Sequence, residues 1–457
     1  MGIYGAINSA VSGLAAQATA LENISGNVAN SQTTGFKRLD TTFSDLVAGG
    51  GDTQASQVAG TTYATSRATN TIQGDIAAND VSTYIAINGE GYFVVTAADD
   101  IVDGSTTFED ASFYTRGGDF ELDSEGYLVN GSGYYLKGFQ LDATTGNPIG
   151  DQPEVIQISS QPLPAQASSQ IAYQANLPPT PQTSNYVTAS DDLLDTSGTI
   201  TATNHILIAD QTAFINSSIS GGSTTIYDAN GSSINVELRW AKTAADTWNL
   251  YYASDGDATD SYKLIGQADF DAAGQINSLA VPGDAGVDGN TFSGTNTFTV
   301  ATIAVDGITA TGIDISFANG SLTQFASSSG NATSVSVDGD GYAAGELVGI
   351  SIDESGRINA AYSNSQTRAL YEIPLATFEA EQNLQRVDGA AFAATPTSGE
   401  PDLTGGGSII ANALELSNAD IASEFSKLII TQQAYSANSR IVTTADEMLD
   451  DALNMVR

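Results

Sequence analysis

The sequence of 457 residues contains no cysteine, one histidine and only 14 lysine and arginine residues, against 53 aspartate and glutamate residues. Without cysteine, the chain has no thiolate nucleophile, disulfide, iron–sulfur cluster or Cys-ligated zinc. His205 is the single candidate for any histidine-dependent mechanism. A formal charge of −39 at pH 7 repels phosphate backbones and anionic lipids, so the composition disfavours nucleic-acid binding and membrane-surface binding.

Proline is also scarce, with 11 residues, and long apolar runs are absent from the sequence. No run approaches the roughly 20 residues of a transmembrane helix. Residues 1–20 contain no lysine or arginine, and polar residues interrupt their apolar positions, which is unlike a cleavable secretion signal. We therefore expect no membrane insertion. We expect either a cytosolic protein or one that leaves the cell without a cleaved N-terminal signal.

The sequence does contain a stripe of large apolar residues at each end. Their spacing of three or four residues predicts one helix over about residues 3–30 and another over 416–457. Ser417, three residues before Asp420, is the expected N-cap of the second helix. The two stripes consist of Ile3, Ile7, Val11, Leu14, Leu21, Ile24 and Val28, and of Ile421, Phe425, Leu428, Tyr435, Val442, Leu449 and Val456.

The N-terminal helix is poorly suited to exist alone. Gly13 and Gly26 lie inside it, and Glu22 is its one charged residue. Burial of its large aliphatic side chains would contribute about 10–20 kcal/mol, whereas ordering the backbone costs about 1–2 kcal/mol per residue. We expect the helix to form only against partners. These are first the C-terminal helix and then other copies of the chain, because uncharged faces need cover on several sides. The alternative is an ordinary coiled-coil dimer.

Between the ends, the apolar period changes to two residues, which predicts short strands separated by Gly- and Asn-containing turns. An Asp-x-x-Gly unit between apolar residues recurs at Asp123, Asp228, Asp271 and Asp353. Asp at the first position and Gly at the fourth predict a type I turn between antiparallel strands. The predicted fold class is multidomain, with discontinuous terminal α-helices in a coiled-coil-like core domain and mainly antiparallel β-barrel or β-sandwich central domains.

Composition predicts nested domains. The glycine runs 49–51 and 405–407 separate the helical ends from the β-rich middle, and residues 171–330 contain sixteen acids but three bases. We expect a helical core domain from residues 1–30 and 416–457, extended linkers from 31–75 and 400–415, an inner β-domain from 76–165 and 331–399, and an inserted outer β-domain from 166–330.

No motif predicts catalysis, a cofactor or a metal centre. His205 precedes an apolar segment and is expected to be a structural residue at a strand edge. The segments 255–260 and 338–341 resemble parts of calcium loops but lack the closing Glu of an EF-hand. Solvated turns are therefore expected there, with weak divalent-ion binding left open. We predict that the chain is not an enzyme.

Both ends also carry a family signature. Residues 27–37, Asn-Val-Ala-Asn-Ser-Gln-Thr-Thr-Gly-Phe-Lys, resemble the N-terminal signature of the bacterial flagellar rod, hook and hook-associated axial proteins. Residues 416–420, Leu-Ser-Asn-Ala-Asp, resemble the start of that family's closing helix, and residues 87–93 and 135–139 resemble its inner β-domain. Within this family, the chain length and the inserted second β-domain favour the hook proteins. The signature positions are Asn27, Asn30, Thr33, Gly35, Phe36 and Asn418.

The resemblance implies a structural subunit that assembles through its terminal helices into a curved helical tube. The tube works as a universal joint that transmits motor torque to the filament. The resemblance further implies export by the flagellar type III apparatus without a cleaved signal peptide, and an extracellular location in the hook and basal body. The implied partners are other copies of the chain, the rod, the hook cap and the hook–filament junction proteins. No cofactor is implied.

Three alternatives stay open. The first is a distal rod or hook-associated axial protein, the second is a secreted acidic β-rich adhesin or carbohydrate-binding module, and the third is a hydrolase with β-sandwich domains. An adhesin would keep its function after loss of the terminal helices. A hydrolase would lose activity on substitution of one or two buried carboxylates. A hook subunit would remain folded after the same truncation but would no longer assemble.

Overall fold

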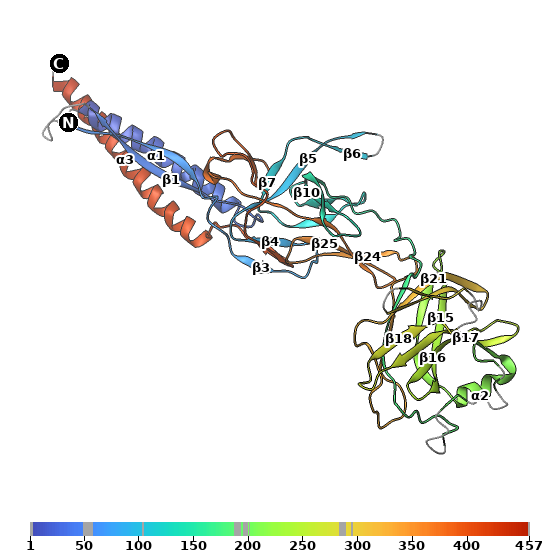
Figure 1. Cartoon of the computed structure of the whole chain (residues 1–457). Coiled ribbons are helices and arrows are strands. Elements are labelled where there is room, and N and C mark those ends of the chain that lie inside the picture. Colours follow the sequence, from blue (N-terminus) through green and yellow to red (C-terminus); the bar gives the residue numbers. More distant parts are fainter. Residues whose placement is uncertain are drawn as a thin grey trace. The chain divides into compact units, whose positions relative to one another are not determined.

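The computed structural model describes residues 3–48, 58–102, 105–186, 193–194, 200, 202–282, 289–293 and 296–455, so the glycine run 49–51 lies outside the described residues. The chain forms two compact units, and each is described here by itself (Figure 1). Both ends of the chain belong to unit 1. Unit 1 comprises Met1–Ser160, Val348–Ala361 and Gln366–Arg457, and unit 2 comprises Gln161–Leu347 and Tyr362–Ser365.

Two long helices lie side by side in unit 1. α1 (Ile3–Ala29) and α3 (Ile421–Met455) run antiparallel, so the first and last described residues lie at the same end of the pair (Figure 1). The helical spacing in both terminal stripes is thus confirmed as helix. Within the described part of the chain, no helix combines the length and the apolar composition that crossing a membrane requires.

The start of α3 differs from the sequence prediction. Asp420 is the N-cap, because its Oδ1 accepts a hydrogen bond of 2.7 Å from the backbone N–H of Ser423. Ser417 lies in the turn before the helix, where its Oγ accepts the N–H of Ala419 at 3.2 Å. The prediction of Ser417 as the cap was therefore wrong. Both residue types cap helices well, and the spacing alone did not distinguish them.

A two-stranded ribbon packs along α1. Strands β1 (Leu39–Ala48) and β2 (Val58–Ala68) are antiparallel, with Leu39 opposite Ala68, where the sequence analysis expected an extended linker. Asn23 of α1 is buried and its Nδ2 donates to Thr41 Oγ1 and Ser66 Oγ, both at 2.9 Å. The ribbon thus supplies the hydrogen bonds that water would otherwise make to Asn23 on this face of α1.

The largest sheet of unit 1 contains thirteen described strands, with a path β24-β25-β26-β10-β5-β7-β29-β28. Its core includes Tyr92, Tyr114, Phe378 and Phe392, whose rings meet edge to face. The strands are β5 (Tyr92–Val102), β6 (Ser105–Phe108), β7 (Phe113–Thr115), β8 (Phe120–Leu122), β9 (Leu128–Asn130), β10 (Tyr134–Leu141), β11 (Pro148–Val155), β24 (Leu347–Ile352), β25 (Arg357–Tyr362), β26 (Thr367–Glu372), β27 (Leu375–Ala376), β28 (Gln385–Val387) and β29 (Ala391–Ala393).

Two short strand pairs join the N-terminal part of the chain to the C-terminal part. β3 (Ile76–Ala78) pairs with β31 (Ala413–Glu415), and β4 (Ile85–Asn88) pairs with β30 (Ser408–Ala411), both antiparallel. Residues that follow α1 and residues that precede α3 are therefore hydrogen-bonded neighbours. A short 3-10 helix, Glu381–Asn383, also lies in this unit.

Unit 2 is built from two sheets that share one hydrophobic core. Tyr173 and Trp240, on different sheets, meet in that core, where Trp240 Nε1 donates to Tyr173 Oη at 2.7 Å. One sheet contains β12 (Gln170–Asn176), β19 (Thr291–Ser293), β20 (Thr297–Val305), β21 (Ile308–Ser316), β22 (Leu322–Thr323) and β23 (Thr333–Gly339). The other contains β13 (His205–Leu207), β14 (Ile219–Tyr227), β15 (Ser233–Ala244), β16 (Thr247–Ala253), β17 (Asp260–Phe270) and β18 (Ile276–Ala280).

Strand β12 pairs parallel with β21 and β22, whereas the other strand pairs with a described register, such as β12 with β23 and β20 with β21, are antiparallel. A 3-10 helix, Ile208–Asp210, and the short helix α2 (Gln211–Asn216) follow β13. These findings confirm a multidomain, mostly antiparallel β fold with helical ends.

The four predicted Asp-x-x-Gly turns are confirmed. In each turn the Gly N–H donates to the Asp carbonyl, at 2.9–3.2 Å, and the Gly adopts positive φ, as at Gly126 with φ 88°. The Asp carboxylate accepts the backbone N–H groups two and four residues later, as Asp123 does from Glu125 and Tyr127. The turns connect β8 to β9, β14 to β15, β17 to β18 and β24 to β25.

Candidate assembly surface

The large apolar side chains of the terminal helices are only partly covered within one chain. Val11 of α1 is 49% exposed, and Phe425 and Tyr435 of α3 are 50% and 42% exposed. Ile24 is buried, Ile421 is exposed, and Ile7, Leu14, Leu21, Val28, Leu428, Val442 and Leu449 are half-buried. Val456 lies outside the described residues, and Ile3 begins α1 with a side chain outside the described set.

A second face of α1, which the sequence analysis did not identify, makes the contact within the chain. Ala10, Gly13, Ala16 and Ala20 are buried there, at steps of three and four residues. A Cβ atom at Gly13 would lie 2.8 Å from Nδ2 of Asn438, so the two helices approach closely at this point. Packing within the chain therefore buries mainly small residues of α1 together with Ile24, and leaves the other large stripe residues partly or largely exposed.

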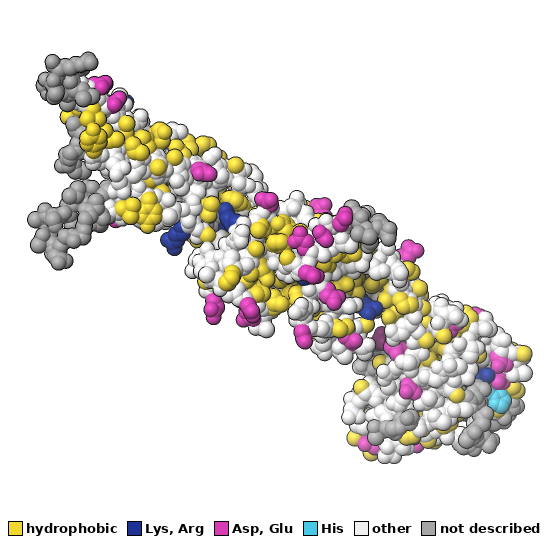
Figure 2. All heavy atoms as spheres, turned by 90° about the horizontal axis from the view of Figure 1, so that it is seen from above, with side chains coloured by type: hydrophobic (Ala, Val, Ile, Leu, Met, Phe, Trp, Pro, Cys, Tyr) yellow, Lys and Arg dark blue, Asp and Glu magenta, His cyan; other side chains and the backbone are white. Residues whose placement is uncertain are grey.

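Further large apolar side chains are exposed beside the predicted stripes. Hydrophobic side chains cover much of the helical end in the view of Figure 2. Exposed apolar patches on a soluble chain mark interaction sites, because their hydration is unfavourable. We call the following exposed residues the apolar helical surface: Val11, Phe43, Leu46, Tyr63, Ile421, Phe425, Ile429, Ile430, Tyr435, Ile441 and Met448.

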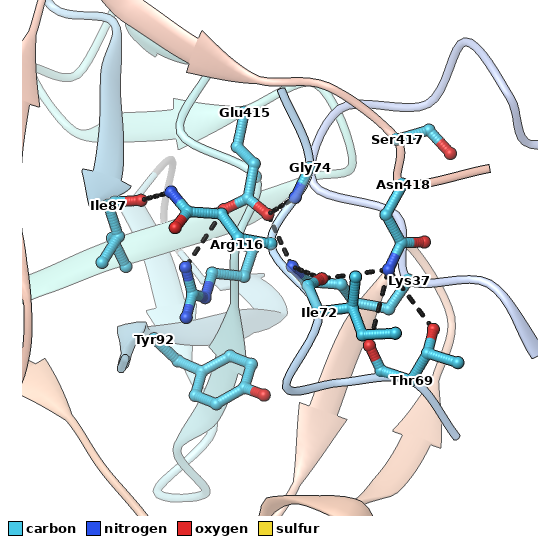
Figure 3. Close-up of polar contacts among 12 residues, drawn as sticks. Lys37, Thr69, Ile72, Gly74, Ile87, Tyr92, Arg116, Glu415, Ser417 and Asn418 are labelled. Atoms are coloured by element: carbon cyan, nitrogen blue, oxygen red, sulfur yellow. Dashed lines mark hydrogen bonds and ion pairs between the residues drawn. The ribbon is translucent and has the colours of Figure 1, made fainter. Parts of the chain in front are cut away.

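A buried charge cluster links the segments next to the two terminal helices to the thirteen-stranded sheet of unit 1, called the inner sheet below (Figure 3). Lys37 Nζ lies 2.5 Å from Glu415 Oε1, and Arg116 NH1 lies 3.1 Å from Glu415 Oε2. Lys37 follows α1, Glu415 ends β31 shortly before α3, and Arg116 follows β7 of the inner sheet. We call these three residues the Glu415 cluster. The cluster fixes both terminal segments to one point of the β-structure.

Lys37 and Glu415 make further hydrogen bonds in the Glu415 cluster, whereas Nε of Arg116 is buried without a hydrogen-bond partner among the described residues. Lys37 Nζ donates to the carbonyl of Ile72 at 2.8 Å, and Glu415 Oε1 also accepts the N–H of Gly74 at 2.9 Å. Burial lowers the pKa of Lys37, and the adjacent Glu415 carboxylate opposes that shift. A buried ion pair with this many hydrogen bonds is costly to break, because either partner alone would be an uncompensated charge.

Tyr92 extends this arrangement into the aromatic core. The guanidinium of Arg116 lies over its ring, 5.2 Å from the centroid. The Tyr92 hydroxyl donates to Glu381 Oε2 at 3.1 Å, and burial together with that carboxylate raises the pKa of Tyr92 far above its usual value. The interior thus contains two cations, Lys37 and Arg116, and two carboxylates, Glu415 and Glu381, so its formal charges cancel. Such an arrangement fixes the relative positions of the segments that carry these residues. The charge cluster was missed in the sequence analysis, although Lys37 lies in the quoted signature.

The signature asparagines Asn27 and Asn418 connect segments that are far apart in the sequence. Asn27 Nδ2 donates to the carbonyl of Leu39 at 2.8 Å and to Oε2 of the buried Glu424 in α3 at 3.1 Å. Its Oδ1 accepts the N–H of Leu39 at 2.9 Å. Asn418 Oδ1 accepts the N–H of Arg38 at 2.7 Å, and its Nδ2 donates to the carbonyl of Ile72 at 3.0 Å (Figure 3).

The other signature positions shape the turn after α1. The carbonyl oxygen and side-chain Oδ1 of Asn30 accept the N–H and Oγ1–H of Thr33 at 3.1 and 3.2 Å. Gly35 has φ 66°, and a Cβ there would lie 2.4 Å from the backbone nitrogen of Gly117. The guanidinium of Arg386 lies over the ring of Phe36. The signature therefore builds the junction between the helical end and the inner sheet.

Comparison with known proteins identifies the family. The flagellar hook protein FlgE of Brucella suis is 30% identical over 462 residues, covering 100% of both chains. That of Escherichia coli is 30% identical, covering 98% of this chain and 100% of the relative. The chain belongs to the flagellar hook protein FlgE family. The hook protein of Caulobacter vibrioides is 28% identical and also covers 100% of both chains.

Family profiles match four segments of this hook-family chain. "Flagella basal body rod protein" matches residues 7–37, and "Flagellar hook protein FlgE/F/G D1 domain" matches residues 86–171. "Flagellar basal body protein FlaE D2 domain" matches residues 194–342, and "Flagellar basal body rod FlgEFG protein C-terminal" matches residues 410–455. A crystal structure of Helicobacter pylori flagellar hook protein FlgE2 aligns with a TM-score of 0.48 and 14% identity, covering 74% of this chain and 100% of that chain.

The remaining candidate residues of this hook-family chain serve turns and strands. His205 is half-buried in β13, opposite Lys263. Asp257 accepts the N–H groups of Thr259 and Asp260, which hold the pKa of its carboxyl below the usual range. Asp340 accepts the N–H groups of Ser169 and Gln170. Over the described ranges, no group of three or more His, Asp and Glu side chains is arranged to hold a metal ion.

Proposed function

We propose that this chain is the repeating structural subunit of the bacterial flagellar hook, the tube that acts as a universal joint between motor and filament. The observation that carries the proposal is the similarity over 100% of the chain to hook proteins of other bacteria. The structure adds a physical route to assembly, because one copy leaves the apolar helical surface exposed to water. The role is mechanical, with no chemical step assigned to any residue.

In the tube, α1 and α3 of many copies would pack into a coiled-coil-like core. The half-buried and exposed residues of both helices would then lose their remaining contact with water. Phe425 is 50% exposed, so its full burial would remove about 100 Å² from water and contribute about 2.5 kcal/mol at ~25 cal/mol per Å². Multiplied over the apolar helical surface of every copy, this gain is large enough to drive polymerisation.

The domain scheme that supports this function has four parts. The helical core would consist of residues 1–30 and 416–457, with the connecting segments 31–75 and 400–415 around it. The inner β-domain would consist of residues 76–165 and 331–399, and the outer domain of residues 166–330. The two β-domains would form the outer shells of the tube and slide against neighbouring copies as the tube bends.

The place of the chain in the flagellum follows from the same proposal. It would be exported without cleavage of a signal peptide and would assemble outside the cell. Its partners would be further copies of itself, the rod, the hook cap and the hook–filament junction proteins. The absence of cysteine suits passage in an unfolded state, since no disulfide can form on the way.

Electron microscopy of the purified, concentrated protein tests the proposal. The full-length chain is expected to form short tubes. A variant lacking residues 1–30 and 421–457 should remain folded, because both sheets of unit 2 and the inner sheet of unit 1 keep their strands. It should form no tubes. Tubes from the truncated chain, or none from the full-length chain under any condition that keeps it folded, would overturn the proposal.

A point variant distinguishes assembly through the terminal helices from nonspecific association of exposed apolar residues. Phe425→Ser removes an exposed apolar side chain from α3, so the folding stability of the monomer should change little, whereas tube formation should need a concentration about tenfold higher. Phe325→Ser is the matched control, since Phe325 is exposed to a similar degree, at 48% against 50%, but lies in unit 2. Equal effects of the two substitutions would contradict assembly through the helices.

A further inference from the structure

A groove of about 400 Å³ opens between α1, β1 and α3 in unit 1. Its apolar lining includes Ile24, Leu39, Phe43 and Ile430, of which Phe43 and Ile430 are largely exposed. Arg67 and Lys427 also line it. Asp40 and Glu424 line it as well, so the groove offers an apolar floor with both cations and carboxylates on its walls.

The charges around the groove are partly balanced within the chain. Lys427 Nζ lies 2.7 Å from Glu424 Oε1 and 3.2 Å from Asp40 Oδ1, and Arg38 also reaches Asp40. The Arg67 side chain is exposed and makes no hydrogen bond or ion pair with the described residues. The lining itself thus holds two cations and two carboxylates, and Arg38 adds a third cation beside Asp40. Arg67 is the lining cation without a carboxylate partner among the described residues, on a chain whose net charge is −39.

The far end of α3 has the opposite character. Asp446, Glu447, Asp450 and Asp451 are exposed there, and no basic residue lies in the last turn. Negative charge at a helix C-terminus is unfavourable, because the carbonyl ends of the helix dipole lie there. Met448, 54% exposed, lies among these acids. We call residues 446–451 the acidic tip.

The acidic tip of one copy cannot reach the groove of the same copy. Lys427 at the groove and Met448 at the tip belong to one continuous helix, so about 30 Å of helix separates them at ~1.5 Å per residue. A contact between tip and groove therefore needs two molecules. It joins different surfaces of the two partners, and such head-to-tail contacts generate open helical filaments when they do not close into a ring.

We infer that the acidic tip of α3 from one copy docks into the groove of the next copy, with Met448 against the apolar floor and the tip carboxylates beside Arg67 and Lys427. This inference rests on the proposed function, since it names the contact through which copies stack. The opposite charges and the exposed apolar atoms on both partners are what commit the groove to a second copy of this chain.

A charge-exchange experiment tests the pairing. Arg67→Glu and Asp450→Arg are each expected to raise the critical concentration for tube growth about tenfold, because each places like charges together. The double variant should return to within about threefold of the original chain. Arg440→Glu is the matched control, since Arg440 is also exposed on the terminal helices but is not among the groove-lining residues, and it should change the critical concentration by less than twofold.

Cross-linking provides a second measurement that does not depend on rates. The chain has no cysteine, so Phe43→Cys with Met448→Cys introduces one thiol at the groove and one at the tip. Oxidised tubes should give a ladder of covalent dimers, trimers and longer chains, because a disulfide needs Cα atoms within about 7 Å. Each single variant should give no product beyond a dimer.

The outcomes separate this inference from the proposed function. If the unmodified chain forms tubes but the double cysteine variant gives no ladder, the tip does not dock in the groove, although the hook assignment stands. Failure of the double charge variant to recover, or an equal effect of Arg440→Glu, also overturns the inference. If the unmodified chain forms no tubes at all, the proposed function fails as well.

Discussion

Lys37 Nζ and Glu415 Oε1 lie 2.5 Å apart, and neither side chain has any exposed surface. The two residues are separated by 378 positions in the chain, and they flank the two terminal helices. The two terminal segments are therefore joined by a buried ion pair as well as by the packing of α1 against α3. A subunit built in this way can transmit force from its helical end to its inner sheet through a small number of buried bonds.

Substitution of Glu415 should loosen this junction without affecting unit 2. Glu415→Gln leaves Lys37 buried without its charge partner, so unit 1 should lose about 3–5 kcal/mol of unfolding free energy. Both tryptophans, Trp240 and Trp248, lie in unit 2, whereas the two long helices lie in unit 1. In a urea titration, circular dichroism at 222 nm should shift to lower urea while tryptophan fluorescence keeps its midpoint.

Glu22→Gln serves as the control for that measurement. Glu22 is exposed on α1, so the loss of its charge should change the helical transition by no more than about 0.5 kcal/mol. A Glu415→Gln variant that unfolds like the Glu22→Gln variant would show that the Glu415 cluster does not hold the ends in place.

Two glycines of the N-terminal segment should respond in opposite directions to alanine. Gly35→Ala places a Cβ at φ 66° and 2.4 Å from the Gly117 nitrogen, so it should destabilise unit 1 by about 2 kcal/mol or more. Gly26 lies in α1, and a Cβ added there would meet no neighbouring atom within 4 Å, so Gly26→Ala should stabilise the helix by about 0.5–1 kcal/mol. Thermal unfolding followed at 222 nm measures both. Equal signs for the two substitutions would contradict the assignment of Gly35 as a strained turn.

Local chemistry made part of this fold predictable. The helices follow from the three- and four-residue spacing of large side chains, and the turns at Asp123 and Asp228 follow from hydrogen bonds within five residues. Both signals lie inside one short window of sequence. The β1–β2 ribbon has no comparable signal, because its strands are rich in Thr, Ser and Ala and are held by contacts such as Asn23 to Ser66.

The candidate site was predictable to a smaller extent. The stripes of large residues correctly marked the terminal helices, but the face that pairs α1 within the chain is made of small residues such as Ala16 and Gly13, which have no hydrophobic period of their own. Asn27 and Asn418 each form a hydrogen bond with a residue hundreds of positions away in the sequence, Asn27 with Glu424 and Asn418 with Arg38. Only the folded chain reveals such pairs.

Acid should weaken unit 2 through its turn carboxylates. Hydrogen bonds from the backbone N–H groups of Ser232 and Asn230 hold the pKa of Asp228 below its usual value. Between the lowered folded pKa and the unfolded value near 3.9, the unfolded chain binds more protons than the folded chain. This contribution to stability is therefore present above about pH 4 and is lost as the pH falls through the folded pKa.

The Asp228→Asn variant isolates that contribution. Its amide oxygen can accept the same two backbone hydrogen bonds but cannot be protonated in this range. Urea midpoints from tryptophan fluorescence should fall between pH 5 and pH 2.5 for both chains, and should fall less for the variant. Parallel pH dependences of the two chains would show that the Asp228 carboxylate is not among the groups whose protonation destabilises unit 2.

Hydrogen exchange should distinguish how firmly α1 is held in one copy and in the tube. Within a single chain, α1 is covered mainly along Ala10, Gly13, Ala16, Ala20 and Ile24, and residues such as Val11 remain exposed. Opening of such a helix exposes little additional apolar surface, so its amides should exchange rapidly in dilute monomer. Assembly should slow them by a factor on the order of 100 or more, because neighbouring copies then cover the remaining faces.

Strand β16 of unit 2 supplies the internal reference for that experiment. Its residues Trp248, Leu250 and Tyr252 are buried in the shared core of the two sheets, so its amides should exchange slowly in monomer and tube alike. If α1 amides in monomer were as protected as those of β16, the intramolecular contacts would suffice to order the helix. Polymerisation would then have to be driven by docking of preformed helical surfaces, and not by folding of the terminal helices upon assembly.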